Sequence, residues 1–482
     1  MNAFIPPNLM PALPELVLLG MACLVLVVDL FLPQSKRGFT LLLSLAALLA
    51  TAAALWQVAP VEIMVSFNGS FVLDRLAVIL KLGLLLILFL VFVYSRDFLR
   101  EFGMYRGEYY ALGLFAALGM MIMISAYSFL LLYLGLELLA LSLYAMIAFR
   151  RDSAVASEAA MKYFVLGAMA SGFLLYGMSL FYGVTGTLDL ARLSDVIRIQ
   201  SVESPVMLSF ALTFIVVGIA FKLGAVPFHM WVPDVYHGAP TSVTLFLGTA
   251  PKIAGFAMAI RLLVDGAGAL QVEWGQMFVA LAVASLAIGN IVAIAQTNFK
   301  RMLAYSTVSH VGFIMMGLLA GTATGYAAAM FYTLTYALTA AAAFGVLMLL
   351  SRDGREASDL ADLRGLNDRH PWYAALLAIA LFSMAGVPPT VGFYAKLVVV
   401  NAVIQVDMLW LAIVAVLFSV IGLFYYLRAV KVMYFDKPEE GQEFHLLDAL
   451  DNRVLLSANG VSLLLLGLFP SALMAWCLTV FV

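Results

Sequence analysis

The chain has 482 residues, of which 64% are hydrophobic and only 11% are charged, and its formal net charge is -2. This composition excludes a soluble globular domain and indicates a multi-pass membrane protein. The near-zero charge gives no indication of nucleic-acid binding. Two cysteines are too few for an iron–sulfur cluster with four cysteine ligands or for a disulfide framework, and the sequence contains no GxGxxG or Walker A motif.

Hydropathy predicts an all-α membrane protein with about 14 transmembrane helices, because the apolar runs are long enough to cross a bilayer. The loops are short and leave no room for a soluble domain. Residues 189–200 (DLARLSDVIRIQ) have the apolar spacing of a helix that lies along a surface. The predicted spans are 8–31, 38–57, 73–95, 107–126, 128–149, 157–183, 205–226, 238–264, 274–296, 301–320, 324–351, 371–404, 408–435 and 454–480.

The basic residues predict the orientation of these spans. With the N-terminus outside, 17 of the 26 Lys and Arg residues fall on the inner side and 4 on the outer side. Positively charged loops favour the cytoplasmic side. Both termini are therefore predicted to be periplasmic.

Two predicted spans contain helix breakers next to a charge. The seventh runs into FKLGAVPFHMWVPDVYHGAP, with Gly224 and Pro227, and the twelfth contains AGVPPTVGFYAKLVV, with Gly386 and Pro388. A proline removes a backbone hydrogen bond, so broken helices occur in membranes only where protein or water satisfies the freed groups. Paired interruptions of this kind are typical of repeats with a binding or transport site at the membrane midplane.

The interrupted spans lie five apart and run in opposite directions, which predicts two inverted five-helix repeats, spans 4–8 and 9–13. The chain would then divide into N-terminal helices at 1–106, a first repeat at 107–264, a second repeat at 274–435 and a C-terminal helix at 454–482.

Ionisable residues at mid-span predict proton or ion transfer across the membrane. Glu137, Lys222, Lys252 and Lys396 all lie inside apolar runs. A charge at bilayer depth costs a few kcal/mol and therefore marks an ion or proton pathway. Burial disfavours a charged lysine and a nearby carboxylate favours it. A Glu137–Lys222 pair that separates would therefore release a proton through Lys252 towards Lys396.

Other charged residues have simpler interpretations. Lys162 is a possible accessory site, but an ion pair with Glu158, four residues earlier, is an equally good explanation. His310 is either a relay residue or a hydrogen-bonded core histidine. Lys81, near the start of its span, is expected to extend towards the membrane surface. Glu15, near one end of the first span, is expected to be interfacial.

These residues lie in motifs that resemble a known family. The run FKLGAVPFHMWVPDVYHGAPTSVTLFLGTAPKIAGF resembles the seventh and eighth helices of the antiporter-like subunits of respiratory complex I, and its PDVYHGAP form is similar to the subunit N branch. YLGLELLALSLYAM, NFKRMLAYSTVSHVGF and FSMAGVPPTVGFYAK are similar to the fifth, tenth and broken twelfth helices. The resemblance covers nearly the whole chain.

The resemblance implies a proton-translocating membrane-arm subunit of a bacterial inner-membrane NADH:quinone oxidoreductase, without a cofactor of its own. By position, Glu137, Lys222, Lys252 and Lys396 correspond to the family's glutamate and three lysines. The implied partners are another antiporter-like subunit, small hydrophobic subunits and the lipid bilayer, while quinone is reduced elsewhere in the complex.

Three other classes are weighed against this interpretation. A subunit of a multisubunit cation/proton antiporter or of a membrane-bound hydrogenase shares these charges, although the PDVYHGAP form argues against both. A haem-binding subunit needs axial ligands, commonly paired histidines, and only His310 is at mid-span. A structural anchor leaves the buried charges and paired breaks unexplained.

Overall fold

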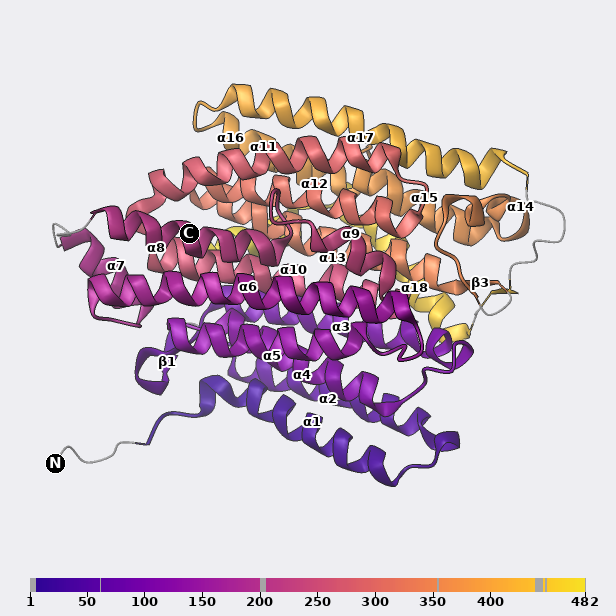
Figure 1. Ribbon diagram of the computed structural model, residues 1–482, viewed down its shortest axis with the longest axis horizontal. Helices are drawn as coiled ribbons and strands as arrows, with labels where there is room; N and C mark the ends of the chain where they lie inside the picture. The colour runs from indigo at the N-terminus through magenta and orange to yellow at the C-terminus, as the bar shows by residue number, and fades with distance from the viewer. Residues whose placement is uncertain are drawn as a thin grey trace.

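The computed structural model is a bundle of long helices that run nearly parallel to one another (Figure 1). It describes residues 6–60, 62–199, 205–352, 355–437, 445–446 and 449–481. The long helices are α1 (Leu13–Phe31), α2 (Gly38–Val58), α3 (Arg75–Glu101), α4 (Gly107–Ser125), α5 (Phe129–Ile147), α6 (Ala154–Thr185), α8 (Pro205–Leu223), α10 (Thr241–Ala259), α11 (Gln271–Ala295), α12 (Phe299–Leu319), α13 (Ala323–Leu349), α17 (Leu409–Phe435) and α18 (Leu450–Leu468). The shorter helices are α7 (Leu190–Ile199), α9 (Trp231–Gly238), α14 (Leu366–Arg369), α15 (Pro371–Ala385), α16 (Val391–Ile404) and α19 (Ser471–Phe481).

The helix lengths confirm an all-helical multi-pass membrane protein. Among the described residues, twelve helical segments are long and apolar enough to cross a membrane, and a thirteenth is present if α18 and α19 form one span. The helix predicted at 371–404 is broken as expected, into α15 and α16. The span predicted at 454–480 corresponds to α18 and α19, between which the chain bends by 74°. The number of fourteen spans and the repeat boundaries stay predictions.

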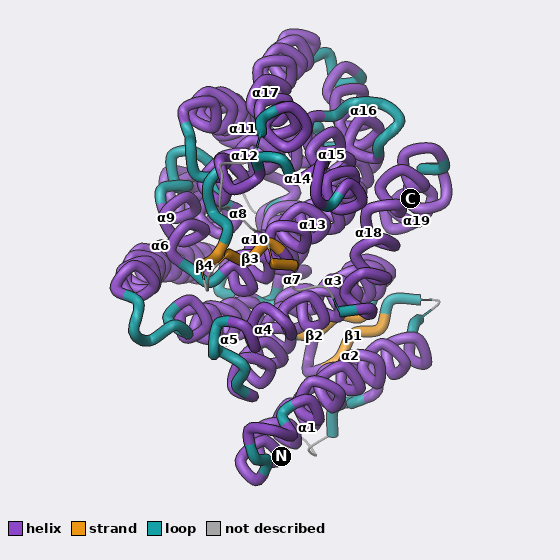
Figure 2. Tube along the Cα trace, turned by 90° about the vertical axis from the view of Figure 1, so that its right-hand side faces the viewer, coloured by secondary structure: helices purple, strands orange, loops and turns teal. Residues whose placement is uncertain are grey.

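The bundle has central and peripheral helices, as the view along the helix axes shows (Figure 2). The segment Thr241–Gly266, which includes α10, is buried throughout its most apolar stretch, and α12 and α13 are 94% buried over theirs. The most apolar stretches of α6 and α17 are only 33% buried. Two helices that carry predicted site residues, α10 with Lys252 and α12 with His310, therefore lie in the centre of the protein.

The ends of the bundle form two faces, which Figure 1 shows at left and right. The loops before α2, α4, α6 and α12 all lie at one end, with α14 and a sheet of strands β3 (Leu350–Arg352), β4 (Arg355–Glu356) and β5 (His445–Leu446) in the order β4-β3-β5. We call this end the basic face, since it includes Arg37, Arg106, Arg150 and Lys300.

The opposite face carries an antiparallel hairpin and a short surface helix. The hairpin consists of β1 (Met64–Ser66) and β2 (Phe71–Leu73). The helix is α7, which confirms the helical conformation predicted for residues 189–200. Its apolar side packs inward, with Leu190 and Leu193 buried.

Candidate functional site

The first helix break lies between α8 and α9. Helix α8 ends at Leu223, and Gly224 follows with a φ of +84°, a conformation that favours glycine. A break inside the membrane frees carbonyl groups that need partners. The carbonyl of Leu223 accepts a hydrogen bond of 2.7 Å from Lys252 Nζ, and the Trp231 indole donates to the Phe221 carbonyl at 3.0 Å. The break thus creates the polar surroundings of Lys252.

The second break, between α15 and α16, has the same arrangement. Helix α15 ends at Ala385, and Gly386 follows, again with a φ of +84°. Lys396 Nζ donates to the Ala385 carbonyl at 2.8 Å and to Ser419 Oγ, on α17, at 2.7 Å. Each break therefore places a lysine ammonium against the last carbonyl of a half-helix, where the helix dipole favours a positive charge.

Lys252 is 1% exposed and has no carboxylate within ion-pair distance in the described part of the chain. Its Nζ lies 5.5 Å from the centroid of the Trp231 ring. Aromatic and carbonyl partners stabilise a cation less than a carboxylate does. Lys252 is therefore a site that can hold a proton and release it without breaking an ion pair.

Glu137 and Lys222 face the same region but are not an ion pair. Glu137 accepts a hydrogen bond from Ser171 on α6. Lys222 is 7% exposed, and among the described residues it has no hydrogen bond and no carboxylate within 4.0 Å. Lys222 and Ser171 both line a small cavity between α5, α6 and α8. The structure therefore does not contain the predicted Glu137–Lys222 ion pair.

His310 lies at the centre of a cluster of hydroxyl groups on α12, α13 and α17. Its Nδ1 is 2.7 Å from the Tyr332 hydroxyl and its Nε2 is 3.2 Å from the Tyr426 hydroxyl. It also lines a cavity with Ser383 of α15 and Ala395, the neighbour of Lys396. His310 is thus hydrogen-bonded and buried, as the simpler interpretation expected, and it also lies beside the second break.

Three hydroxyl groups lie between Lys252 and His310, and sequence reasoning missed all three. The buried Tyr236 hydroxyl packs beside Gly248, one helical turn before Lys252. Tyr336 donates to Thr307 Oγ1 at 2.7 Å, and its ring lies 4.7 Å from that of His310. Tyrosine and threonine are common in membrane helices, so no sequence signal could have selected these residues.

Lys162 is placed away from the other predicted site residues. Its side chain is 43% exposed and forms ion pairs with Glu158 at 2.9 Å and Asp234 at 2.8 Å. Asp234 also binds Arg301 at 2.7 Å. This geometry agrees with the alternative explanation for Lys162, an ion pair with Glu158.

We expect Lys162→Ala to lower proton pumping by less than about fivefold, because exposed ion pairs contribute little. Pumping by membrane vesicles driven by NADH, normalised to the amount of assembled complex, measures the effect. A loss of pumping as large as that from Lys252→Ala would indicate that Lys162 takes part in the proton path.

The expectation that Lys81 extends to the membrane surface was wrong, and Glu15 is not interfacial. Both side chains are buried, at 0% and 7% exposure, and form an ion pair with each other between α3 and α1. Near them, Arg261 binds Asp74 at 2.8 Å and Asp265 at 2.9 Å. Glu15 of the first span reaches Lys81 on α3, a contact that hydropathy alone does not reveal.

Comparison with known proteins agrees with this architecture. A family model described as "NADH:quinone oxidoreductase/Mrp antiporter, TM" matches residues 126–422, which include both breaks. The chain is similar to NADH-quinone oxidoreductase subunit N of Thioalkalivibrio sulfidiphilus, with 63% identity over 97% of both chains, and of Herminiimonas arsenicoxydans, with 55% identity over 98% of this chain and 97% of that one.

Solved structures show the same fold. A chain of respiratory complex I from Thermus thermophilus superposes with a TM-score of 0.82 at 32% identity, over 96% of this chain and 98% of that one. A chain of the Mrp complex from Dietzia sp. reaches the same TM-score at 22% identity, over 98% of this chain and 96% of that one, which shows a common fold.

Two broken helices with a lysine at each break, inside an all-helical membrane bundle, define an antiporter-like membrane subunit of the proton-translocating type. The two subunit N relatives described above have one name and match over almost their whole length. The chain belongs to the NADH-quinone oxidoreductase subunit N branch of this family.

Proposed function

We propose that the chain is a membrane-arm subunit of a bacterial NADH:quinone oxidoreductase and moves protons along Glu137, Lys222, Lys252 and Lys396, with His310 between the last two. The observation that carries the proposal is the repeated arrangement at the two breaks, where a lysine ammonium binds the final carbonyl of a half-helix. Such a site holds a proton at membrane depth without a fixed carboxylate partner.

The order of the residues supports a lateral path through the protein. Lys222 and Lys252 lie on either side of the first break. The ammonium of Lys252 approaches Gly224 in the break, and the carbon chain of Lys222 approaches Gly255 on α10. The hydroxyls of Tyr236, Thr307 and Tyr336 lead from Lys252 to His310. A proton released when Glu137 and Lys222 separate then has acceptors on the way to Lys396.

The chain acts in this proposal through acid–base groups only, and the redox chemistry takes place in other subunits. Its partners are another antiporter-like subunit and small hydrophobic subunits, and both termini are periplasmic, since the basic face is expected to be cytoplasmic. The antiporter and hydrogenase alternatives have less support, because the Mrp relative is only 22% identical.

We expect a tagged copy of the chain to migrate on a native gel with a large band that oxidises NADH. Mildly solubilised membranes of the source organism provide the sample, and in-gel NADH oxidation provides the measurement. A tag confined to bands without this activity would contradict the proposal and favour an antiporter subunit, for which sodium/proton exchange is the next assay.

A further inference from the structure

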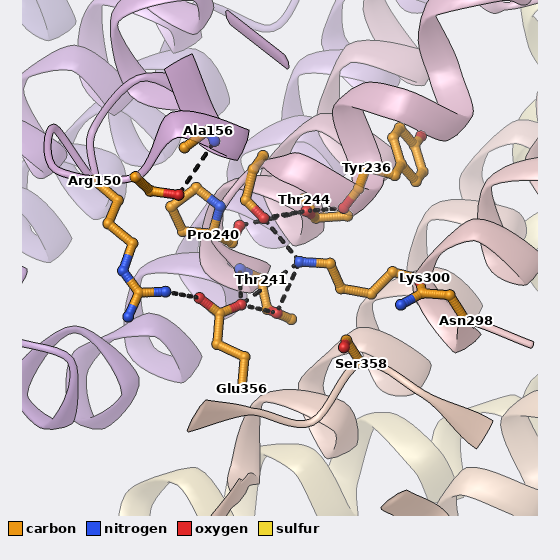
Figure 3. Close-up of polar contacts among 12 residues, drawn as sticks. Arg150, Ala156, Tyr236, Pro240, Thr241, Thr244, Asn298, Lys300, Glu356 and Ser358 are labelled. Atoms are coloured by element: carbon orange, nitrogen blue, oxygen red, sulfur yellow. Dashed lines mark hydrogen bonds and ion pairs between the residues drawn. The ribbon is translucent and has the colours of Figure 1, made fainter. Parts of the chain in front are cut away.

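Charged groups at the two faces of the bundle have different partners. At the basic face, Lys300 Nζ donates to the Ala239 carbonyl at 2.8 Å and lies 3.5 Å from Glu356 Oε2, as Figure 3 shows. Arg75 begins α3 at the opposite face, which we call the hairpin face, and its side chain is exposed. Its guanidinium donates to the Thr479 carbonyl of α19 at 3.3 Å, and no carboxylate lies within 4.0 Å of it among the described residues. The positive charge of Arg75 therefore has no acidic partner in this part of the chain.

An apolar groove of about 200 Å³ lies between α3, α13 and α19, and the residues that line it carry no charge. Its main lining side chains are those of Leu82, Leu86, Ile253, Leu338, Leu473 and Trp476. Leu86 is 52% exposed and Trp476 is 60% exposed, whereas Ile253, on the central helix α10, is 0% exposed. The groove is therefore open on the outside of the bundle and ends at α10.

Arg75 and the groove lie along one side of α3. The lining residues Ile79, Leu82 and Leu86 follow this arginine by four, seven and eleven positions, which is the spacing of side chains on one side of an α-helix. Eleven residues of helix span about 16 Å, which is about half of a hydrocarbon core of ~30 Å. The groove therefore has the depth of one membrane leaflet, with Arg75 at its surface end.

The size and polarity of the groove select its occupant. Water needs polar partners, and a cavity lined by apolar groups stays dry. A helix with its side chains is about 10 Å wide, which is too wide for a groove of about 200 Å³, whereas a single acyl chain is narrow enough and as apolar as leucine. Arginine binds phosphate oxygens through paired N–H donors, and tryptophan is favoured at the level of the lipid headgroups. Arg75 and Trp476 therefore match the two ends of a phospholipid headgroup region.

We propose that this groove binds one acyl chain of a phospholipid from the leaflet at the hairpin face, with the lipid phosphate at Arg75. The acyl chain packs between α3 and α19 and reaches Ile253, the residue that follows Lys252 on α10. The lipid thereby fills the space between the C-terminal helix and the centre of the bundle. The site lies outside the proposed proton path, and the inference does not depend on that function.

Photolabelling of the assembled complex that contains this chain tests the site. The purified complex is reconstituted into vesicles of phosphatidylethanolamine and phosphatidylglycerol, with a small share of phosphatidylglycerol that carries a diazirine on one acyl chain. Mass spectrometry after irradiation identifies the labelled peptides. We expect label on residues 79–87 of α3 and 473–476 of α19. Absence of label from both segments would overturn the inference, as would cross-links that show another subunit in the groove.

The variant Leu473→Trp fills the groove from α19. It should abolish the label on residues 79–87, because the larger side chain occupies the space of the acyl chain. The matched control is Leu130→Trp on α5, where the leucine is 60% exposed and lies outside the groove, and the label should not change. Undiminished label in assembled Leu473→Trp complexes would contradict an acyl chain in this groove.

The variant Arg75→Gln tests the headgroup contact, and it remains informative if Leu473→Trp disturbs assembly, because Arg75 is exposed. At a limiting amount of the photoreactive lipid, we expect labelling of the groove to fall about fivefold, the effect of one basic residue on an anionic lipid at a membrane surface. The control is Arg192→Gln on α7, an exposed arginine at the same face, which should leave the labelling unchanged. Equal labelling of Arg75→Gln and wild type would overturn the assignment of the phosphate to Arg75.

Discussion

Lys222→Ala is expected to lower proton pumping by at least about tenfold, because a positioned acid–base group contributes more than that to a proton-transfer rate. Glu137→Ala should have a similar effect, since it removes the carboxylate with which Lys222 is proposed to pair. The measurement is NADH-driven acidification of vesicles, with NADH oxidation followed in the same sample.

The matched control for this pair is Ser171→Ala. Ser171 donates to Glu137 and lines the same cavity, but it has no charge. Loss of one hydrogen bond corresponds to about 1 kcal/mol, or about fivefold in rate. Equal losses from Lys222→Ala, Glu137→Ala and Ser171→Ala would mean that the cavity matters only for packing and would contradict the acid–base assignment.

Lys81→Ala is expected to destabilise the protein strongly, although sequence alone suggested a silent substitution. Glu15 and Lys81 are buried together, so removing the lysine leaves a buried carboxylate without its partner. Breaking a buried ion pair in this way costs about 3–5 kcal/mol. The amount of chain in the membrane and the thermal stability of the solubilised complex measure the loss.

The double variant Glu15→Leu/Lys81→Met distinguishes stability from proton transfer. It removes both charges and keeps similar volumes, and such replacements are often neutral or stabilising. We expect it to recover the stability lost in Lys81→Ala and to pump protons normally. Recovery of stability without recovery of pumping would add the Glu15–Lys81 pair to the proton path.

Lys222 and Lys81 show that the burial of a charged side chain has to be determined from the structure. Lys222 and Lys81 both lie in apolar runs, and the helix break that follows Lys222 distinguished them in the sequence. The structure buries both and gives only Lys81 a carboxylate contact. Their expected phenotypes differ for that reason: Lys222 is proposed to exchange protons, whereas Lys81 is held in an ion pair.

Local features of the sequence determined the helical class, the approximate span boundaries and the position of both breaks. Hydropathy acts over a stretch of about 20 residues, and glycine and proline act on their own backbone, so both can be read without knowing any neighbour. The same holds for the depth of Glu137, Lys252 and Lys396 within their spans.

Only the tertiary structure decided which groups these charges meet. Lys252 binds a carbonyl 29 positions earlier in the chain, and Glu356 binds Thr241 across 115 positions. Such contacts depend on which helices pack together, and nearly uniform apolar helices have no periodic pattern that specifies a neighbour. The separated Glu137 and Lys222, the buried Lys81 and the charged cluster at Lys300 were therefore determined by helix packing.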